Sequence, residues 1–213
     1  TLESNWKEIA AELSSLVQKD NSTTSRSNFN SNWTVVGSGD RGSGGEDHRV
    51  VSPGGKWTEY VLFGTGASRT TADAPFTKNL LRKCVPDAVS LAQAGGGEVI
   101  FSKLEPNTRI AAHCGPTNFR WTAHLGLVIP SSTTKSCSIR VAEEWHQWET
   151  GKVLLFDDSY EHEIRNDTDE VRIVLLLRLW HPCLPSHKRQ TELNRALRRK
   201  EEAVEKRYKA PSI

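Results

Sequence analysis

The pattern of apolar positions changes along the chain. Residues 2–18 carry apolar side chains at three- and four-residue spacing, with charged residues between them, which predicts an amphipathic helix. From residue 57 onward, short apolar runs alternate with turn-forming residues, which predicts a mainly β domain. The predicted strands cover residues 57–63, 99–104, 108–112, 120–129, 137–141, 153–156, 162–165 and 171–180.

Strands of this number and spacing predict a jelly roll, in which two sheets pack face to face. A helical stretch at 75–94 interrupts them, and Pro86 is expected to break or kink it. A Gly/Ser-rich stretch at 37–45 is either a connector or a mobile lid. The pattern at 186–209 is helical again and has a basic face. That face is interpreted as solvated, with contact to a membrane or nucleic acid as the alternative.

Composition narrows the class of protein. The chain of 213 residues is 36% hydrophobic, and its mean hydropathy is −0.54. No apolar run approaches the ~20 residues that span a bilayer, so no membrane span is expected. The net charge of +2 does not indicate nucleic acid as a partner. Four cysteines at irregular spacing predict neither a zinc knuckle nor a disulfide framework.

One predicted strand, at 120–129, alternates apolar and polar positions. Strand periodicity places Arg120, Thr122 and His124 on one face. If that face points into the jelly roll, it lines a polar pocket. If it points to solvent, it has no functional meaning, and alternation alone does not choose between the two.

The last predicted strand is almost continuously apolar, which indicates burial on both faces, yet it contains Arg172. A buried guanidinium needs an anionic partner. That partner is either an anionic ligand, to which Ser102 could add a hydroxyl, or a carboxylate of the protein. The protein carboxylates considered for such an ion pair are Asp157, Asp158, Glu161 and Glu163.

Two histidines are candidate metal ligands. His113 follows one predicted strand and His162 begins another. Imidazoles are common ligands of redox-active divalent metals, and two of them from separate strands can converge in a barrel mouth. Taken singly, each is more often a hydrogen-bonded structural histidine, and that interpretation stays open at this point.

Several long segments resemble one known family. HCGPTNFRWTAHLGLVIP (113–130), WETGKVLLFDDSYEHEIRN (148–166) and RIVLLLRLWHP (172–182) closely resemble the aspartyl/asparaginyl β-hydroxylases, which are Fe(II)- and 2-oxoglutarate-dependent oxygenases. KWTEYVLF, APFTKNLL and FSKLEPNT extend the match. The resemblance implies a double-stranded β-helix, a cupin-like jelly roll, at 56–184. An N-terminal helix and Gly/Ser-rich loop (1–55) and a basic C-terminal helix (185–213) would flank it.

The resemblance also implies cofactors and ligands. Fe(II) would be held by His113 and His162, the catalytic histidines, with 2-oxoglutarate and O2 as cosubstrates. Gly115 falls where most oxygenases of this type place a third, carboxylate ligand. The distal carboxylate of 2-oxoglutarate would be bound by Arg172 and Ser102.

Two further positions are implied to bind the metal end of 2-oxoglutarate, namely His124 and Thr122. Thr122 departs from the animal members of the family, which have an arginine there, so recognition of an acidic group beside the metal is expected to be weaker. Arg120 and Trp57 would lie on the substrate side.

The implied activity is hydroxylation of an unactivated C–H bond. The bond would belong to the β-carbon of Asp or Asn in a protein or peptide, or to a small molecule or natural product. The alternative is a non-catalytic cupin-like protein that binds 2-oxoglutarate or metal, which the threonine at position 122 motivates. A hydrolytic zinc site on the same histidines is the weakest alternative, because the sequence offers no well-placed general-base glutamate.

Overall fold

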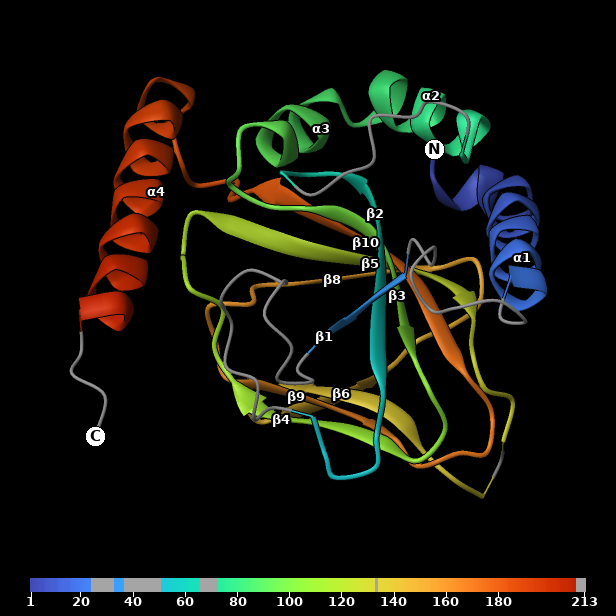
Figure 1. The fold of residues 1–213 in the computed structure, drawn as a ribbon. Helices are drawn as coiled ribbons and strands as arrows, with labels where there is room; N and C mark the ends of the chain where they lie inside the picture. Colours follow the sequence, from blue (N-terminus) through green and yellow to red (C-terminus); the bar gives the residue numbers. More distant parts are fainter. Residues whose placement is uncertain (24–32, 37–50, 66–72, 133, 210–213) are drawn as a thin grey trace.

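The computed structural model describes residues 1–23, 33–36, 51–65, 73–132 and 134–209. The Gly/Ser-rich stretch predicted at 37–45 lies outside these residues. The described strands form two antiparallel sheets that face each other (Figure 1). Their bounds are β1 Trp33–Val36, β2 Trp57–Phe63, β3 Val99–Leu104, β4 Thr108–His113, β5 Arg120–Val128, β6 Cys137–Val141, β7 Glu144–Gln147, β8 Val153–Phe156, β9 His162–Asn166 and β10 Arg172–Trp180.

The strand order is that of a jelly roll. Within the described chain, the larger sheet runs β1-β2-β3-β10-β5-β8 and the smaller sheet runs β4-β9-β6-β7. Strands that are distant in sequence are neighbours, as in the pairing of β10 with both β3 and β5. The arrangement confirms the predicted mainly β, double-stranded β-helix fold with flanking helices.

Strand alternation separates the interior of the barrel from the face that the helices cover. In β10 the odd-numbered residues, such as Leu175 and Leu177, pack under the helices. The even-numbered Val174 and Leu176 pack between the two sheets. Arg172 has the even parity, so it belongs to the interior layer. The same parity rule gives the polar positions of β3 and β5 access to the barrel interior.

The helices are η1 Glu3–Asn5, α1 Trp6–Thr23, α2 Pro75–Cys84, α3 Pro86–Gln93 and α4 Ser186–Lys209. Pro86 separates α2 from α3, as the sequence predicts. Ile9 and Leu13 of α1 are fully buried in the same core as the larger sheet. Glu12 accepts hydrogen bonds from the backbone N–H groups of Phe76 and Thr77, each at 2.8 Å, and so caps the start of α2.

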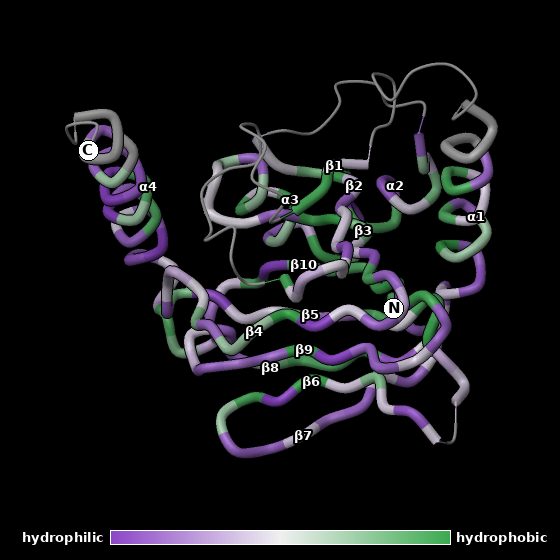
Figure 2. Tube along the Cα trace, turned by 60° about the horizontal axis from the view of Figure 1, so that its bottom comes forward, coloured by the Kyte–Doolittle hydropathy of each residue, from purple (hydrophilic) through white to green (hydrophobic). Residues whose placement is uncertain are grey.

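Two short strands, β1 and β7, were not predicted, since each is four residues long at the edge of its sheet. The helix α4 stands at the side of the barrel and is mostly hydrophilic (Figures 1 and 2). Its Leu193 is buried against Leu91 and Phe119, which anchors its first half. None of the helices in the described part of the chain is long and apolar enough to cross a bilayer.

Candidate active site

The structure brings two histidines together at the end of the smaller sheet. His113 on β4 and His162 on β9 are partners in the strand register, and their ring centroids lie 4.2 Å apart. The Nδ1 atom of His113 is 2.8 Å from the carbonyl oxygen of Ala111, and that of His162 is 2.9 Å from the carbonyl oxygen of Tyr160. A carbonyl can only accept, so both Nδ1 atoms carry the proton. Both Nε2 lone pairs are left for a metal ion.

Burial favours the ligand form of His162. The residue is 6% exposed, and desolvation lowers the pKa of His162 from 6.5 to about 4. The imidazole is therefore neutral at pH 7, which is the form that binds a metal.

The space beside this pair is filled by a carboxylate from another loop. A Cβ atom on Gly115 would lie 2.6 Å from Oδ2 of Asp158, and the N–H of Gly115 donates to the carbonyl oxygen of Asp158 at 2.6 Å. A side chain at position 115 therefore does not fit. Across the residues that the structure describes, no group of three or more His, Cys, Asp or Glu side chains is arranged to hold a metal ion. The two imidazoles are the residues that the sequence resemblance implies as metal ligands, and that assignment stays a prediction.

Arg172 lies at the start of β10 in the barrel interior and is 1% exposed. Its Nε and Nη1 atoms have no hydrogen-bond partner among the described residues. Its guanidinium carbon lies 4.8 Å from the centre of the Trp148 ring. Burial lowers the pKa of Arg172 to about 10, so the group stays charged at neutral pH.

Within the described chain, Arg172 does not form the ion pair with a protein carboxylate that the sequence left open as the alternative. The four candidate carboxylates contact other residues: His181 faces Asp157, Arg120 and Arg178 face Asp158, and Arg140 faces Glu161 and Glu163. A buried cation that lacks a protein anion is the feature expected of an anion-binding site.

Ser102 supplies a hydroxyl beside Arg172. It pairs with Val174 on β10, so it is a same-face diagonal neighbour of Arg172. The indole N–H of Trp57 donates to Oγ of Ser102 at 3.0 Å. Because that oxygen is the acceptor, the hydroxyl proton of Ser102 is left for another acceptor. Trp57, expected on the substrate side, therefore lies beside Ser102.

His124 is held as a neutral donor. The indole N–H of Trp148 donates to Nδ1 of His124 at 3.2 Å, and the two rings stack with centroids 5.9 Å apart. The imidazole proton is therefore on Nε2, which is buried and has no partner in the described chain. Desolvation, reinforced by nearby positive charges such as Arg172, lowers the pKa of His124 well below 6.5. The ring also contacts Phe156, which in turn contacts His162.

Thr122 and Arg120 face a cluster that the sequence did not predict. Thr122 is fully buried and accepts a hydrogen bond from Nη1 of Arg178. The same Nη1 atom lies 2.6 Å from Oδ2 of Asp158. Arg120 also reaches this oxygen, at 3.3 Å, and donates to the carbonyl oxygen of Gly96 at 3.2 Å. Arg120, Thr122, Asp158 and Arg178 thus form one connected polar cluster.

Three residues of this site were missed as contributors: Asp158, Trp148 and Arg178. Asp158 appeared only as one of several partners for Arg172. A usable signal existed for Arg178, because it is charged, interrupts an apolar strand and shares the even parity of Arg172. The indole contact between Trp148 and His124 has no comparable signal, since it joins residues 24 positions apart.

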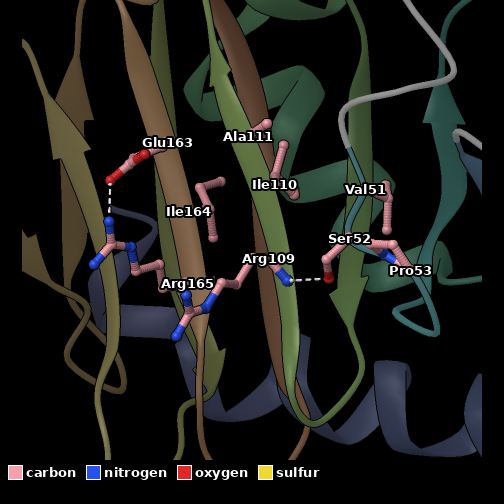
Figure 3. Close-up of a pocket in the computed structure, with 9 residues that line it drawn as sticks. All are labelled: Val51, Ser52, Pro53, Arg109, Ile110, Ala111, Glu163, Ile164 and Arg165. Carbon is pink, nitrogen blue, oxygen red and sulfur yellow. Dashed lines mark hydrogen bonds and ion pairs between the residues drawn. The ribbon is translucent and has the colours of Figure 1, made fainter.

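Another hollow lies on the outer face of the smaller sheet, against residues 51–53 (Figure 3). Its charged groups are paired: Arg165 lies 2.7 Å from Glu163, and Arg109 lies 2.7 Å from Asp167. The N–H of Arg109 also donates to Oγ of Ser52. This hollow lacks the unpartnered groups of the barrel interior and is separate from the candidate active site.

Comparison with known proteins identifies relatives. The family model described as "Aspartyl/Asparaginyl beta-hydroxylase" matches residues 3–182. Human aspartyl/asparaginyl beta-hydroxylase is 39% identical over 139 residues, which are 64% of this chain and 17% of that protein. Ornithine lipid ester-linked acyl 2-hydroxylase of Rhizobium tropici is 34% identical over 133 residues, 62% of this chain and 44% of that protein. The chain therefore spans less than half the length of these curated relatives.

Among solved structures, a Pseudomonas putida prolyl-4-hydroxylase is similar with a TM-score of 0.52 at 14% identity. The similarity covers 83% of this chain and 88% of that one, and it supports the fold alone. The family match at 3–182 includes helix α1, which precedes the segments on which the sequence resemblance rests. On this match, and with a relative at 39% identity, the chain belongs to the aspartyl/asparaginyl β-hydroxylase family.

Proposed function

We propose that this chain is an Fe(II)- and 2-oxoglutarate-dependent dioxygenase that hydroxylates an unactivated C–H bond. The observation that carries the proposal is Arg172, a fully buried guanidinium with no carboxylate partner in the described residues. An unpaired buried charge is costly, so it is best explained by an anionic group of a ligand that enters the barrel. A dicarboxylate such as 2-oxoglutarate has one carboxylate for this cation and another for a metal.

The residues at the site fit both groups. His113 and His162 donate their Nδ1 protons to backbone carbonyl oxygens, which leaves the lone pair of each Nε2 to bind Fe(II). When bound, the iron would supply the redox chemistry by which 2-oxoglutarate, O2 and R–H become succinate, CO2 and R–OH.

The protein's own groups would bind and orient the cosubstrate. Arg172 would hold the distal carboxylate through paired N–H donors, and the hydroxyl of Ser102 would add a third donor. Nε2–H of His124 would donate toward the metal end of the cosubstrate, with Trp148 fixing its tautomer. The apolar side chains between the sheets would exclude water from around the bound cosubstrate.

The substrate is proposed by class. The human relative's name points to aspartyl and asparaginyl side chains, and the Rhizobium relative's name points to a lipid acyl chain. For this chain we propose a peptide or protein side chain with an acidic or amide group, because the sequence resemblance puts Arg120 on the substrate side, where its guanidinium, which already donates to Asp158, would help to orient that group. The alternative is a small-molecule substrate, and a substrate screen would distinguish it from a peptide or protein.

The test measures succinate formation from 2-oxoglutarate under air with Fe(II). His162→Ala and His113→Ala are expected to abolish turnover, and His187→Ala on the exposed surface of α4 is the matched control. Turnover at the wild-type rate in His162→Ala would contradict the proposal. Binding of 2-oxoglutarate without consumption, across aspartyl, asparaginyl and small-molecule substrates, would instead support a non-catalytic binding protein.

A further inference from the structure

Arg178 enters the barrel interior from the far end of β10. It is paired in register with Thr122 of β5 and has the same parity as Arg172, six residues earlier. A Cβ atom on Gly97 would lie only 2.6 Å from Cβ of Arg178, so the glycine makes room for the arginine stem. Its side chain is 15% exposed. Arg172 and Arg178 therefore lie at opposite ends of β10.

The position of the Arg178 guanidinium is fixed on one side. Nη1 donates to Oγ1 of Thr122 and to Oδ2 of Asp158. Its Nε atom is buried and has no partner in the described chain. A guanidinium that is anchored through one nitrogen keeps further N–H donors for a planar anion.

The contacts of Asp158 locate this guanidinium near the histidine pair. Nη1 of Arg178 lies 2.6 Å from Oδ2 of Asp158, and the backbone N–H of Gly115, two residues after His113, donates to the carbonyl oxygen of Asp158 at 2.6 Å. Asp158, its partner, fills the space next to Gly115. Arg178 thus lies at the metal end of the pocket, whereas Arg172 lies at the other end.

We propose that Arg178 binds a carboxylate at the metal end of the pocket, from the strand next to Thr122. The inference rests on the proposed function, which brings two such carboxylates to this end: the 2-oxo acid group of the cosubstrate and an acidic group of the substrate. Thr122 stands where the sequence resemblance implies an arginine, and here it orients Arg178 instead. The cation would then come from β10 rather than from β5.

The experiment measures binding by calorimetry with Mn(II) in place of iron, so that no turnover occurs. One arm titrates 2-oxoglutarate, and a second arm titrates L-aspartate into the protein already loaded with 2-oxoglutarate. Arg178→Met is expected to raise Kd by about 10- to 100-fold in at least one arm, the loss of one charge-assisted interaction. A loss in the first arm assigns the cosubstrate carboxylate, and a loss in the second assigns the substrate group.

Relocation of the charge is the sharper measurement. In the double variant Thr122→Arg with Arg178→Met, the affinity is expected to return to within about threefold of wild type, because the guanidinium would approach from the adjacent strand position. Arg165→Met, which removes a paired arginine on the outer face, is the matched control and should bind normally. If Arg178→Met does not fold, Arg178→Lys, which keeps the charge, is titrated in its place.

A purely structural role is separated by Asp158→Asn in the Arg178→Met background. If Arg178 only neutralises Asp158, removal of that charge restores binding and overturns the inference. Unchanged Kd values for Arg178→Met in every arm that the wild type binds would also overturn it. Failure of the wild type to bind 2-oxoglutarate at all would count against the proposed function instead.

Discussion

The carboxylate of Asp158 occupies the space that a side chain at Gly115 would need. Oδ2 lies 2.6 Å and the backbone oxygen 2.9 Å from the position of a Cβ atom on the glycine. Gly115→Ala is therefore expected to destabilise the protein by about 1–3 kcal/mol, because the loop must move to relieve the overlap. Urea unfolding of the metal-free protein measures the change.

The cause can be separated by a second variant. In an Asp158→Ala background the side-chain overlap is gone and only the backbone contact persists, so Gly115→Ala should cost less there than in the wild type. Equal costs in the two backgrounds would show that the carboxylate is not what restricts position 115.

Arg172→Met should separate binding from stability. The substitution removes the cation proposed to hold the distal carboxylate, so the affinity for 2-oxoglutarate should fall by about 100-fold. It also removes a buried charge without a protein anion, so the metal-free protein should become more stable by about 1–3 kcal/mol. Calorimetry and urea unfolding measure the two effects, with Arg165→Met as the control. A less stable variant would mean that the guanidinium is a structural element of the core.

His162 should make the metal-free fold sensitive to acid. Its pKa is about 4 in the folded protein and 6.5 as the ordinary value, so between these pH values the unfolded chain binds a proton that the folded chain does not. Stability therefore falls as the pH is lowered from 6.5 toward 4, by about 3 kcal/mol in full. Urea midpoints at pH 7 and pH 5 test this, and His162→Gln should show a smaller pH-dependent loss. An equal loss in both proteins would place the effect on other groups.

Glu12 should link the N-terminal helix to the rest of the fold. Its carboxylate accepts the N–H groups of Phe76 and Thr77, and α2 has no side-chain cap of its own at Ala74. Glu12→Ala is expected to lower the free energy of unfolding by about 1–2 kcal/mol. Glu8→Ala, an exposed position on the same helix, should have little effect.

Much of the fold was predictable because strand alternation and turn residues are local signals. The bounds of β2, β3, β6 and β8 agree with the sequence pattern. Strands β1 and β7 were not predicted, because short edge strands bury few side chains and show only a weak alternation of apolar and polar residues. How strands pair is a long-range property, so the sequence pattern offered the convergence of His113 and His162, 49 positions apart, only as one of two interpretations. The resemblance made it an expectation.

The site was predictable where strand alternation decides which side chains share a face. Arg172 and Ser102 share a face in the sequence pattern and in the structure. The absence of an ion pair to Arg172 within the described residues was not predictable, because four carboxylates lie nearby in sequence. The hydrogen bond between Thr122 and Arg178 was not predictable either, because it depends on which strands become neighbours.

Helix α1 has a practical consequence for work with isolated parts of this chain. Ile9, Leu13 and Leu16 cover the outer surface of the larger sheet. A recombinant fragment that starts at residue 56 would lack this helix, so Leu125 and Leu127 of the larger sheet would be exposed. It would also lack the Glu12 carboxylate that caps α2. Such a fragment should aggregate more during expression than the full chain does, which size-exclusion chromatography of the two would measure.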